Sequence, residues 1–135
     1  MKMRFVITTL LALQLPVSGA IAAPAIEGLL QEFRQQGVTQ FDPAAGKQLW
    51  NRKFSNSGDG QIRSCASCHT ADPRQVGKHV RTGKAIEAMA PSVNPARLSD
   101  EKKVSKWLRR NCKWTLGREC SAQEQGDVLM YLKDL

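Results

Sequence analysis

The stretch Cys65-Ala66-Ser67-Cys68-His69 decides how this chain folds. Two cysteines separated by two residues and followed directly by a histidine are typical of covalent attachment of haem c. Each thiol forms a thioether with one vinyl group of the haem, and the adjacent histidine is then in place to ligate the iron. We therefore expect one covalently bound haem c per chain, held by Cys65 and Cys68, with His69 as the proximal iron ligand.

A structural zinc site is the alternative interpretation of the motif, because the sequence has four cysteines and two histidines. Zinc-binding cysteine pairs are usually separated by two to four residues. Seven residues separate Cys112 from Cys120. The spacing of the second pair therefore favours haem over zinc.

The N-terminus predicts export. Lys2 and Arg4 precede a short apolar run over residues 5–15, and Ala20-Ile21-Ala22 offers small residues at the cleavage positions. We expect residues 1–22 to be a cleaved signal peptide and residues 23–135 to form a monohaem cytochrome c domain in the periplasm. The apolar run is too short to span a membrane, so the mature chain is not expected to be membrane-spanning; an uncleaved anchor is the minor alternative.

The charge of the chain bears on its partners. The formal net charge is +8 at pH 7. A basic surface on a small redox protein favours electrostatic steering towards an acidic partner. A solvated basic surface without a partner is an equal alternative. Nucleic-acid binding is not expected, because the basic residues are scattered and the chain is exported.

Two helices are predicted before the haem motif. Apolar residues at helical spacing over 26–33 predict the first. Asp42 is a suitable N-cap for the second, whose apolar face is expected to continue to Phe54. Gly46 and Trp50 place a gap and a large ring on one side of this helix, which would let the last helix of the chain approach closely.

Two further helices are predicted after the motif, with no convincing strand pattern. Residues 70–98 are expected to form an irregular loop with at most one short helical turn, and a capping box at Ser121 opens the last helix. The fold class is therefore all-α, wrapped around one haem. The third helix, capped by Ser99 or Asp100, is expected to bury a face made of Val104, Trp107, Leu108 and Asn111.

The second cysteine pair has its own interpretation. In an exported protein, Cys112 and Cys120 are expected to form a disulfide across a short segment. A redox-active dithiol is the weaker alternative.

The sixth iron ligand has three candidates by residue type, two methionines and one histidine. Met89 lies in a loop rich in prolines, which commonly presents methionine to haem, whereas Met130 lies within the last helix on the side away from its apolar stripe. His79 would make a bis-histidine site, but its polar surroundings predict solvent exposure instead.

Five short motifs of the chain, taken in order, resemble the sphaeroides haem protein family of class I cytochromes c. They are Arg81-Thr82-Gly83-Lys84, Ala90-Pro91-Ser92, Trp107-Leu108, Arg110-Asn111-Cys112 and Gly117-Arg118-Glu119-Cys120. The resemblance implies the class I cytochrome c fold, with Asn111 as the sixth iron ligand of the oxidised protein and a disulfide between Cys112 and Cys120. Without the resemblance, Asn111 is interpreted as a helix C-cap.

The resemblance also implies a function. Members of the family are electron acceptors whose reduced haem binds oxygen or nitric oxide. The resemblance therefore implies the same role for this chain, with a dihaem cytochrome c and a membrane cytochrome b as its electron donors. One alternative is a plain electron carrier with Met89 as permanent ligand. The other is a reductase of nitric oxide, oxygen or peroxide, which would use a cation such as Arg81, Lys84 or Arg110 over the haem. Those cations more simply pair with haem propionates, so no catalytic residue is predicted.

One departure from ordinary class I cytochromes concerns the proximal histidine. Such proteins usually carry a proline roughly a dozen residues past it, whose carbonyl holds the imidazole, but Pro73 comes too early and Pro91 too late. We expect an acceptor for the His69 Nδ1 proton, since ligating histidines almost always have one, but the sequence does not identify it.

Overall fold

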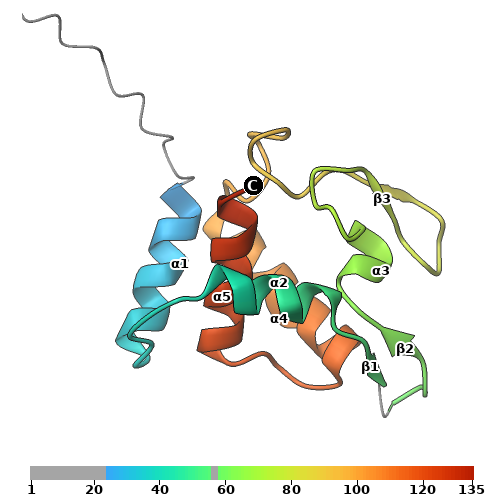
Figure 1. The fold of residues 1–135 in the computed structure, drawn as a ribbon, viewed down its shortest axis with the longest axis horizontal. Helices are drawn as coiled ribbons and strands as arrows, with labels where there is room; N and C mark the ends of the chain where they lie inside the picture. Colours follow the sequence, from blue (N-terminus) through green and yellow to red (C-terminus); the bar gives the residue numbers. More distant parts are fainter. Residues whose placement is uncertain (1–23, 56–57) are drawn as a thin grey trace, which may run out of the picture.

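The computed structural model describes residues 24–55 and 58–135, so the predicted signal peptide lies outside the described residues. The described chain is mainly helical, which confirms the predicted all-α class (Figure 1). The helices are α1 (Pro24–Gln35), α2 (Pro43–Asn51), α3 (Ala66–His69), α4 (Glu101–Leu116) and α5 (Ala122–Lys133). Two short antiparallel ladders pair β1 (Phe54–Ser55) with β2 (Ile62–Arg63), and β3 (Gly77–Lys78) with β4 (Ala85–Ile86).

The predicted N-caps begin three of the helices. The Asp42 side chain accepts from the Ala44 N–H at the start of α2, and Asp100 accepts from the Lys103 N–H at the start of α4. Ser121 forms the complete capping box at the start of α5. Each cap satisfies backbone donors that a helix cannot satisfy internally.

The predicted extent of the second helix is wrong. Helix α2 ends at Asn51, and Phe54 lies in β1, paired with Arg63. The cause is local: Arg52 has an extended backbone, and its N–H bonds back to the carbonyls of Gln48 and Leu49, which closes the helix.

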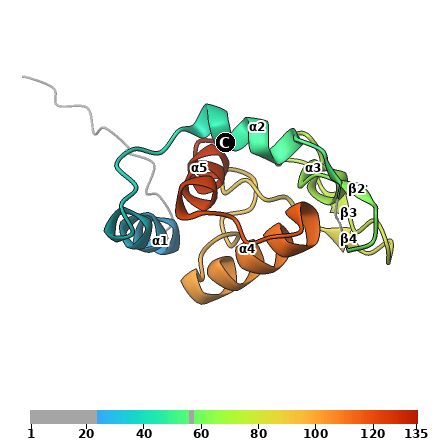
Figure 2. The same ribbon diagram turned by 90° about the horizontal axis from the view of Figure 1, so that it is seen from below.

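Helices α2 and α5 cross at close range (Figure 2). A Cβ atom added to Gly46 would lie 2.0 Å from the backbone oxygen of Asp127, so only glycine permits this approach. The Asp127 carboxylate accepts from the Asp42 backbone N–H at 2.7 Å, which ties the start of α2 to α5. Trp50 lies one turn past Gly46 and is buried. This confirms the prediction that both residues lie on the side of α2 that packs on the last helix.

Two apolar clusters build the core. The first lies between α1, α4 and α5 and consists of Ile26, Leu29, Leu30, Phe33, Phe41, Val104 and Leu129. The second, made of Trp50, Val128, Tyr131 and Leu132, is also touched by Cys65, Ala66 and Met89. The second cluster therefore supports the haem motif, and α5 contributes to both.

The long connection between α3 and α4 is mostly irregular, as predicted, apart from the β3–β4 hairpin. Each strand of that hairpin is two residues long, too short for a recognisable alternation of apolar residues. Over residues 24–55 and 58–135, the helices are too short or too polar to cross a membrane.

Candidate functional site

The haem motif forms a single helical turn. The His69 N–H donates to the Cys65 carbonyl at 3.0 Å, and the Cys68 N–H donates to the same oxygen at 3.2 Å. Cys65 and Cys68 stand three residues apart, so their side chains lie on one side of this turn. Both are free thiols, Cys65 half-buried and Cys68 buried. The structure thus brings the two predicted attachment thiols and the predicted ligand together.

Neighbouring residues hold this turn in place. The Trp50 indole Nε1 donates to the Thr70 carbonyl at 2.9 Å, and its ring lies 5.5 Å from that of His69, centroid to centroid. On the other side, a Cβ atom on Gly77 would lie 2.0 Å from the Cys68 carbonyl oxygen. Strand β3 therefore packs directly against the motif, and an imidazole fixed between such supports has little freedom.

The His69 imidazole is half-buried, and its Nδ1 atom is buried. Burial lowers its pKa to about 4, with smaller contributions from the positive charges of Arg97 and His79. It is therefore neutral at pH 7, the form that ligates a metal. Its Nδ1 atom has no hydrogen-bond partner among the described residues. A ligating histidine binds metal through one ring nitrogen and donates the N–H of the other, so here Nε2 would be the ligating atom and Nδ1 the proton donor.

The backbone acceptor expected for the Nδ1 proton of His69 is not found in the described part of the chain. The carbonyl of Pro73, the nearest proline after the motif, instead accepts from the N–H groups of Met89 and Ala90, at 2.8 and 3.1 Å. That acceptor stays a prediction.

The remaining cysteines do not form a zinc site with the motif. Cys112 and Cys120 are joined by a disulfide. Burial raises the pKa of the free Cys65 thiol to about 11. In the parts of the chain that the structure describes, no three histidine, cysteine or acidic residues come together as a metal site.

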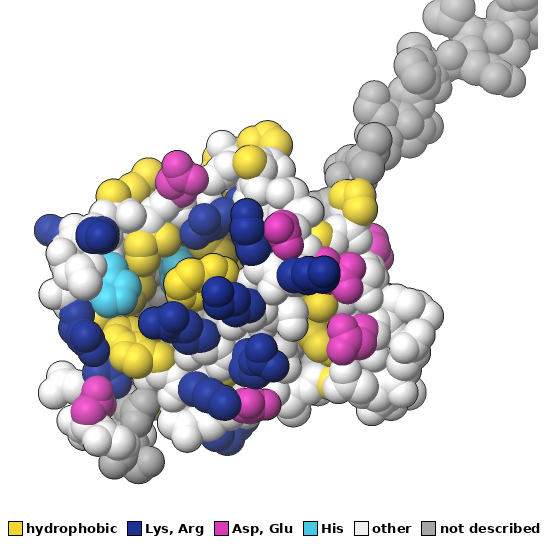
Figure 3. Space-filling view, turned by 180° about the vertical axis from the view of Figure 1, so that it is seen from behind, with side chains coloured by type: hydrophobic (Ala, Val, Ile, Leu, Met, Phe, Trp, Pro, Cys, Tyr) yellow, Lys and Arg dark blue, Asp and Glu magenta, His cyan; other side chains and the backbone are white. Residues whose placement is uncertain are grey.

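Apolar side chains remain uncovered around the motif. Figure 3 shows histidine side chains (cyan) among apolar ones (yellow) on one face, with lysine and arginine (dark blue) around them. Exposed apolar surface of this kind marks a place where something else binds. Among the described residues, the large apolar side chains that are at least half exposed are Ile62, Val76, Val80, Val93 and Trp107. Free paired thiols, an adjacent neutral imidazole and an uncovered apolar surface together fit haem c.

Asn111 lies in the interior of α4. The helix continues to Leu116 and is closed by Gly117 in the left-handed conformation, so Asn111 is not its C-cap. Asn111 is half-buried, and its amide makes no hydrogen bond within the described residues. Trp107, four residues before it, and Trp114, three residues after it, lie on the same flank of the helix.

The predicted burial of Trp107 is wrong: the side chain is 50% exposed, whereas Val104 is buried and Leu108 half-buried. The angular positions of these residues around the helix axis explain why Trp107 is more exposed than Val104 and Leu108. Val104 and Leu108 point directly at the core, whereas Trp107 lies further round, on the flank of Asn111.

The disulfide follows Asn111 directly. Cys112 and Cys120 are buried, and their Cα atoms lie 5.5 Å apart. The bond links the last turns of α4 to the segment that begins α5 and restricts how far the backbone next to Asn111 can move.

The two methionine candidates are engaged with protein groups. The Met89 sulfur accepts from the Arg97 guanidinium at 3.2 Å, and its side chain packs against the second apolar cluster. Met130 packs against the first cluster. Arg97 has no sequence signal that would have identified it, because Met89 lies eight residues away in an irregular loop with no helical or strand periodicity.

The predicted exposure of His79 is also wrong, since the side chain is half-buried and stacks on Trp114 with ring centroids 5.9 Å apart. Its Nδ1 lies within 3.3 Å of two backbone N–H groups of the following turn. The Arg63 guanidinium lies 4.1 Å from the centroid of the Trp114 ring. The stack joins three segments that are distant in sequence, so periodicity does not reveal it.

Comparison with known proteins gives a consistent result. The family described as "Domain of unknown function (DUF1924)" matches residues 36–132. The cytochrome c-type protein SHP of Cereibacter sphaeroides is 35% identical over 122 residues, covering 86% of this chain and 93% of that protein.

Solved structures agree with the sequence comparison. The structure of oxidised SHP, described as an oxygen-binding cytochrome c, superposes with a TM-score of 0.72 at 32% identity, covering 82% of this chain and 96% of that one. The solution structure of cytochrome c'' from Methylophilus methylotrophus, a protein described as undergoing haem-ligand detachment, gives 0.73 at 33% identity, covering 84% and 95%. Both relatives are c-type cytochromes, which confirms the predicted fold class and haem c as the cofactor. The residues that hold the haem stay a prediction.

Proposed function

This chain belongs to the DUF1924 family and to the SHP-like c-type cytochromes, and from that membership we propose that it is a periplasmic monohaem cytochrome that accepts an electron and then exchanges Asn111 for oxygen or nitric oxide. In this proposal Cys65 and Cys68 carry the haem, and His69 is the permanent iron ligand. The electron donors are a dihaem cytochrome c and, behind it, a membrane cytochrome b.

The environment of Asn111 is the observation that carries the proposal. Its amide is half-buried inside a helix, lacks a hydrogen-bond partner among the described residues, and is followed at once by a disulfide. Because the amide is not fully buried and makes no hydrogen bond to the described residues, it is open to a ligand from outside the protein. An iron ligand position explains both the missing partner and the restraint on the backbone.

The chemistry of an amide explains why the ligand would be released. Haem c supplies an iron centre that takes up one electron and that, when ferrous, binds diatomic gases. The Asn111 oxygen is neutral and hard, so it binds the ferric state better than the ferrous state. His69 is neutral at working pH and stays in place on the other side. Reduction therefore weakens only one of the two protein ligands.

The relatives support this view. SHP is described as an oxygen-binding cytochrome c, and cytochrome c'' is described as undergoing haem-ligand detachment. The names of both relatives are those of cytochromes rather than of enzymes. We accordingly propose binding without turnover; sustained consumption of nitric oxide, oxygen or peroxide with excess reductant would contradict it.

Three variants of the holoprotein test the ligand. We expect Asn111→Ala to convert the low-spin ferric spectrum to a high-spin one, and Met89→Leu to leave it unchanged. Asn111→His replaces a weak ligand by a strong one, so this variant should stay low-spin after reduction and resist carbon monoxide. The wild type should become high-spin on reduction with dithionite and bind carbon monoxide at once. Optical and magnetic spectra of both oxidation states give the readout.

The opposite pattern identifies a plain electron carrier. Loss of the low-spin ferric spectrum in Met89→Leu, with no change in Asn111→Ala, would make Met89 the ligand. A wild-type ferrous protein that remains low-spin under carbon monoxide would give the same conclusion.

A further inference from the structure

Helix α4 carries a dense group of cations on its solvent side. We define the α4 basic face as the exposed side chains Lys102, Lys106, Arg109, Arg110 and Lys113. Figure 3 shows lysine and arginine side chains gathered on this side of the molecule. We propose that the α4 basic face is the docking surface for an acidic electron-donor protein, an inference that rests on the proposed function.

Helix stability does not account for this arrangement. Several pairs within the α4 basic face, such as Lys102 with Lys106 and Lys106 with Arg109 or Arg110, stand three or four positions apart. Like charges at this spacing destabilise a helix by about 0.2–0.5 kcal/mol per pair. Lys102 also lies in the first turn, where a positive charge opposes the helix dipole. A surface that costs stability is expected where function requires it.

The chain neutralises only the ends of α4. In the described residues, ion pairs on this helix join Lys103 to Asp100 at 3.7 Å and Lys113 to Glu119 at 2.8 Å. Between these ends, Lys106, Arg109 and Arg110 have no carboxylate within ion-pair distance in the described chain. Arg110 lies 5.3 Å from the centroid of the Trp107 ring, and Arg109 is near enough to Glu119 to help lower the pKa of that carboxyl. None of the three charges is neutralised by a direct ion pair within the described residues, so all three can attract an acidic partner.

The α4 basic face is also next to the proposed redox centre. Asn111 follows Arg110 directly, on the neighbouring flank of the same helix. A helix with its side chains is about 10–12 Å across. A protein that docks on the α4 basic face is therefore held within about one helix diameter of the flank that carries Asn111.

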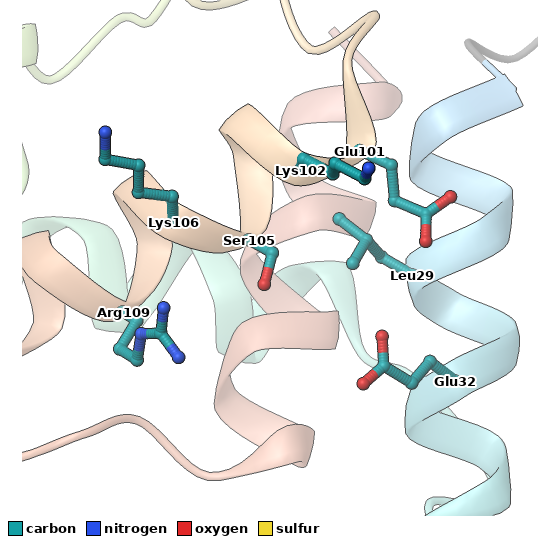
Figure 4. Close-up of a pocket in the computed structure, with 7 residues that line it drawn as sticks. All are labelled: Leu29, Glu32, Glu101, Lys102, Ser105, Lys106 and Arg109. Carbon is teal, nitrogen blue, oxygen red and sulfur yellow. The ribbon is translucent and has the colours of Figure 1, made fainter.

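A hollow between α1 and α4 marks where the α4 basic face ends. A hollow of about 280 Å³ lies between α1 and α4, and Figure 4 shows Glu32 and Glu101 towards α1, with Lys106 and Arg109 along α4. The carboxylates disfavour acidic side chains from a partner at this edge. The α4 basic face therefore ends at the hollow beside α1, where acidic and basic side chains are mixed.

Charge complementarity selects the partner. Association of oppositely charged protein surfaces is accelerated by steering, and arginine is enriched in interface cores. A second copy of this chain would present the same positive charge and be repelled. An acidic redox protein matches both the charge of the surface and its place beside Asn111.

A charge-reversal pair tests the proposal against a matched control. Lys106→Glu with Arg109→Glu changes the α4 basic face, whereas Lys47→Glu with Lys53→Glu makes the same change of net charge in and just after α2, which lies across α5 from α4 (Figure 2). The probe is a reduced dihaem cytochrome c with an acidic surface, mixed with the ferric holoprotein in a stopped-flow instrument at a series of salt concentrations.

The expected result is specific to α4. The wild-type rate constant should fall as salt rises, and the α4 pair should lower it on the order of tenfold at low salt and flatten its salt dependence. The α2 pair should keep most of the wild-type rate. Carbodiimide cross-linking should join carboxylates of the probe to Lys102, Lys106 or Lys113.

Several results would overturn the proposal. These are equal slowing by both pairs, cross-links at Lys47 or Lys53, or tighter binding of phosphatidylglycerol vesicles or a DNA duplex than of the probe at about 150 mM salt. Each variant is also reduced with dithionite under carbon monoxide. A wild type that fails to bind carbon monoxide contradicts the proposed function, whereas variants that bind it but keep the wild-type rate contradict only the docking surface.

Discussion

At the scale of single residues, Trp50 connects the core to the haem motif. Its ring belongs to the second apolar cluster, and its Nε1 donates to the Thr70 carbonyl, directly after His69. Trp50→Phe keeps most of the apolar contact and removes the donor. We expect the free energy of unfolding of the holoprotein to fall by about 1–2 kcal/mol, because a partly buried carbonyl loses its partner.

Guanidinium unfolding of wild type and Trp50→Phe, followed by far-ultraviolet circular dichroism, measures this difference. Equal midpoints and slopes would show that the hydrogen bond contributes nothing net to stability.

At the scale of elements, the start of α5 predicts a pH dependence. Hydrogen bonds from Arg118 and from the Ser121 backbone lower the pKa of the Glu124 carboxyl from 4.5 to about 2. Because the folded-state pKa lies below the unfolded one, the ionised carboxylate stabilises the fold fully above about pH 5. That stabilisation is lost as the pH falls from 4.5 towards 2.

The variant Glu124→Gln isolates this contribution. It should be less stable than wild type by about 1 kcal/mol near pH 7, the usual cost of a lost capping interaction. The difference should shrink between pH 4.5 and 2, measured by urea unfolding at each pH. A difference that stays constant down to about pH 2 would mean that Glu124 acts through packing rather than through its charge.

The elements also show where local sequence is sufficient. Asp42, Asp100 and Ser121 predict three helix starts, because an N-cap needs only a side chain and the next three residues of backbone. The end of α2 was predicted incorrectly, because Phe54 has the spacing of a helical residue but pairs with Arg63 in a ladder. Tertiary pairing outweighs local periodicity at such positions.

At the scale of the whole molecule, the structure predicts what loss of the haem would do. The first apolar cluster joins α1, α4 and α5 without any contribution from the motif, whereas Val76, Val80 and Val93 in the long connection are more than half exposed. We expect a variant that lacks both attachment thiols, Cys65→Ala with Cys68→Ala, to keep its terminal helices. The connection over residues 70–98 should lose its fixed conformation.

Hydrogen–deuterium exchange of this variant and the holoprotein tests the expectation. Amides of α1 and α5 should remain protected, and those of β3 and β4 should exchange rapidly. Protection of β3 and β4 at the level of the holoprotein would show that the connection is ordered by the protein alone.

The sequence alone determined the class of fold, the cofactor and the helix starts. A Cys-x-x-Cys-His motif and N-cap residues act over a few positions, so their chemistry is complete within the local segment. Only the tertiary structure decided that Trp107 is exposed, that His79 stacks on Trp114, and that Arg97 contacts Met89. The His79–Trp114 stack joins the long connection to α4, and the exposure of Trp107 depends on how α4 is rotated against the core. Met89 and Arg97 lie eight residues apart in that connection and meet because the loop folds back on itself. A residue pattern specifies the buried side of a helix. The exposure and contacts of the side chains at the edges of that side depend on how other segments pack against the helix.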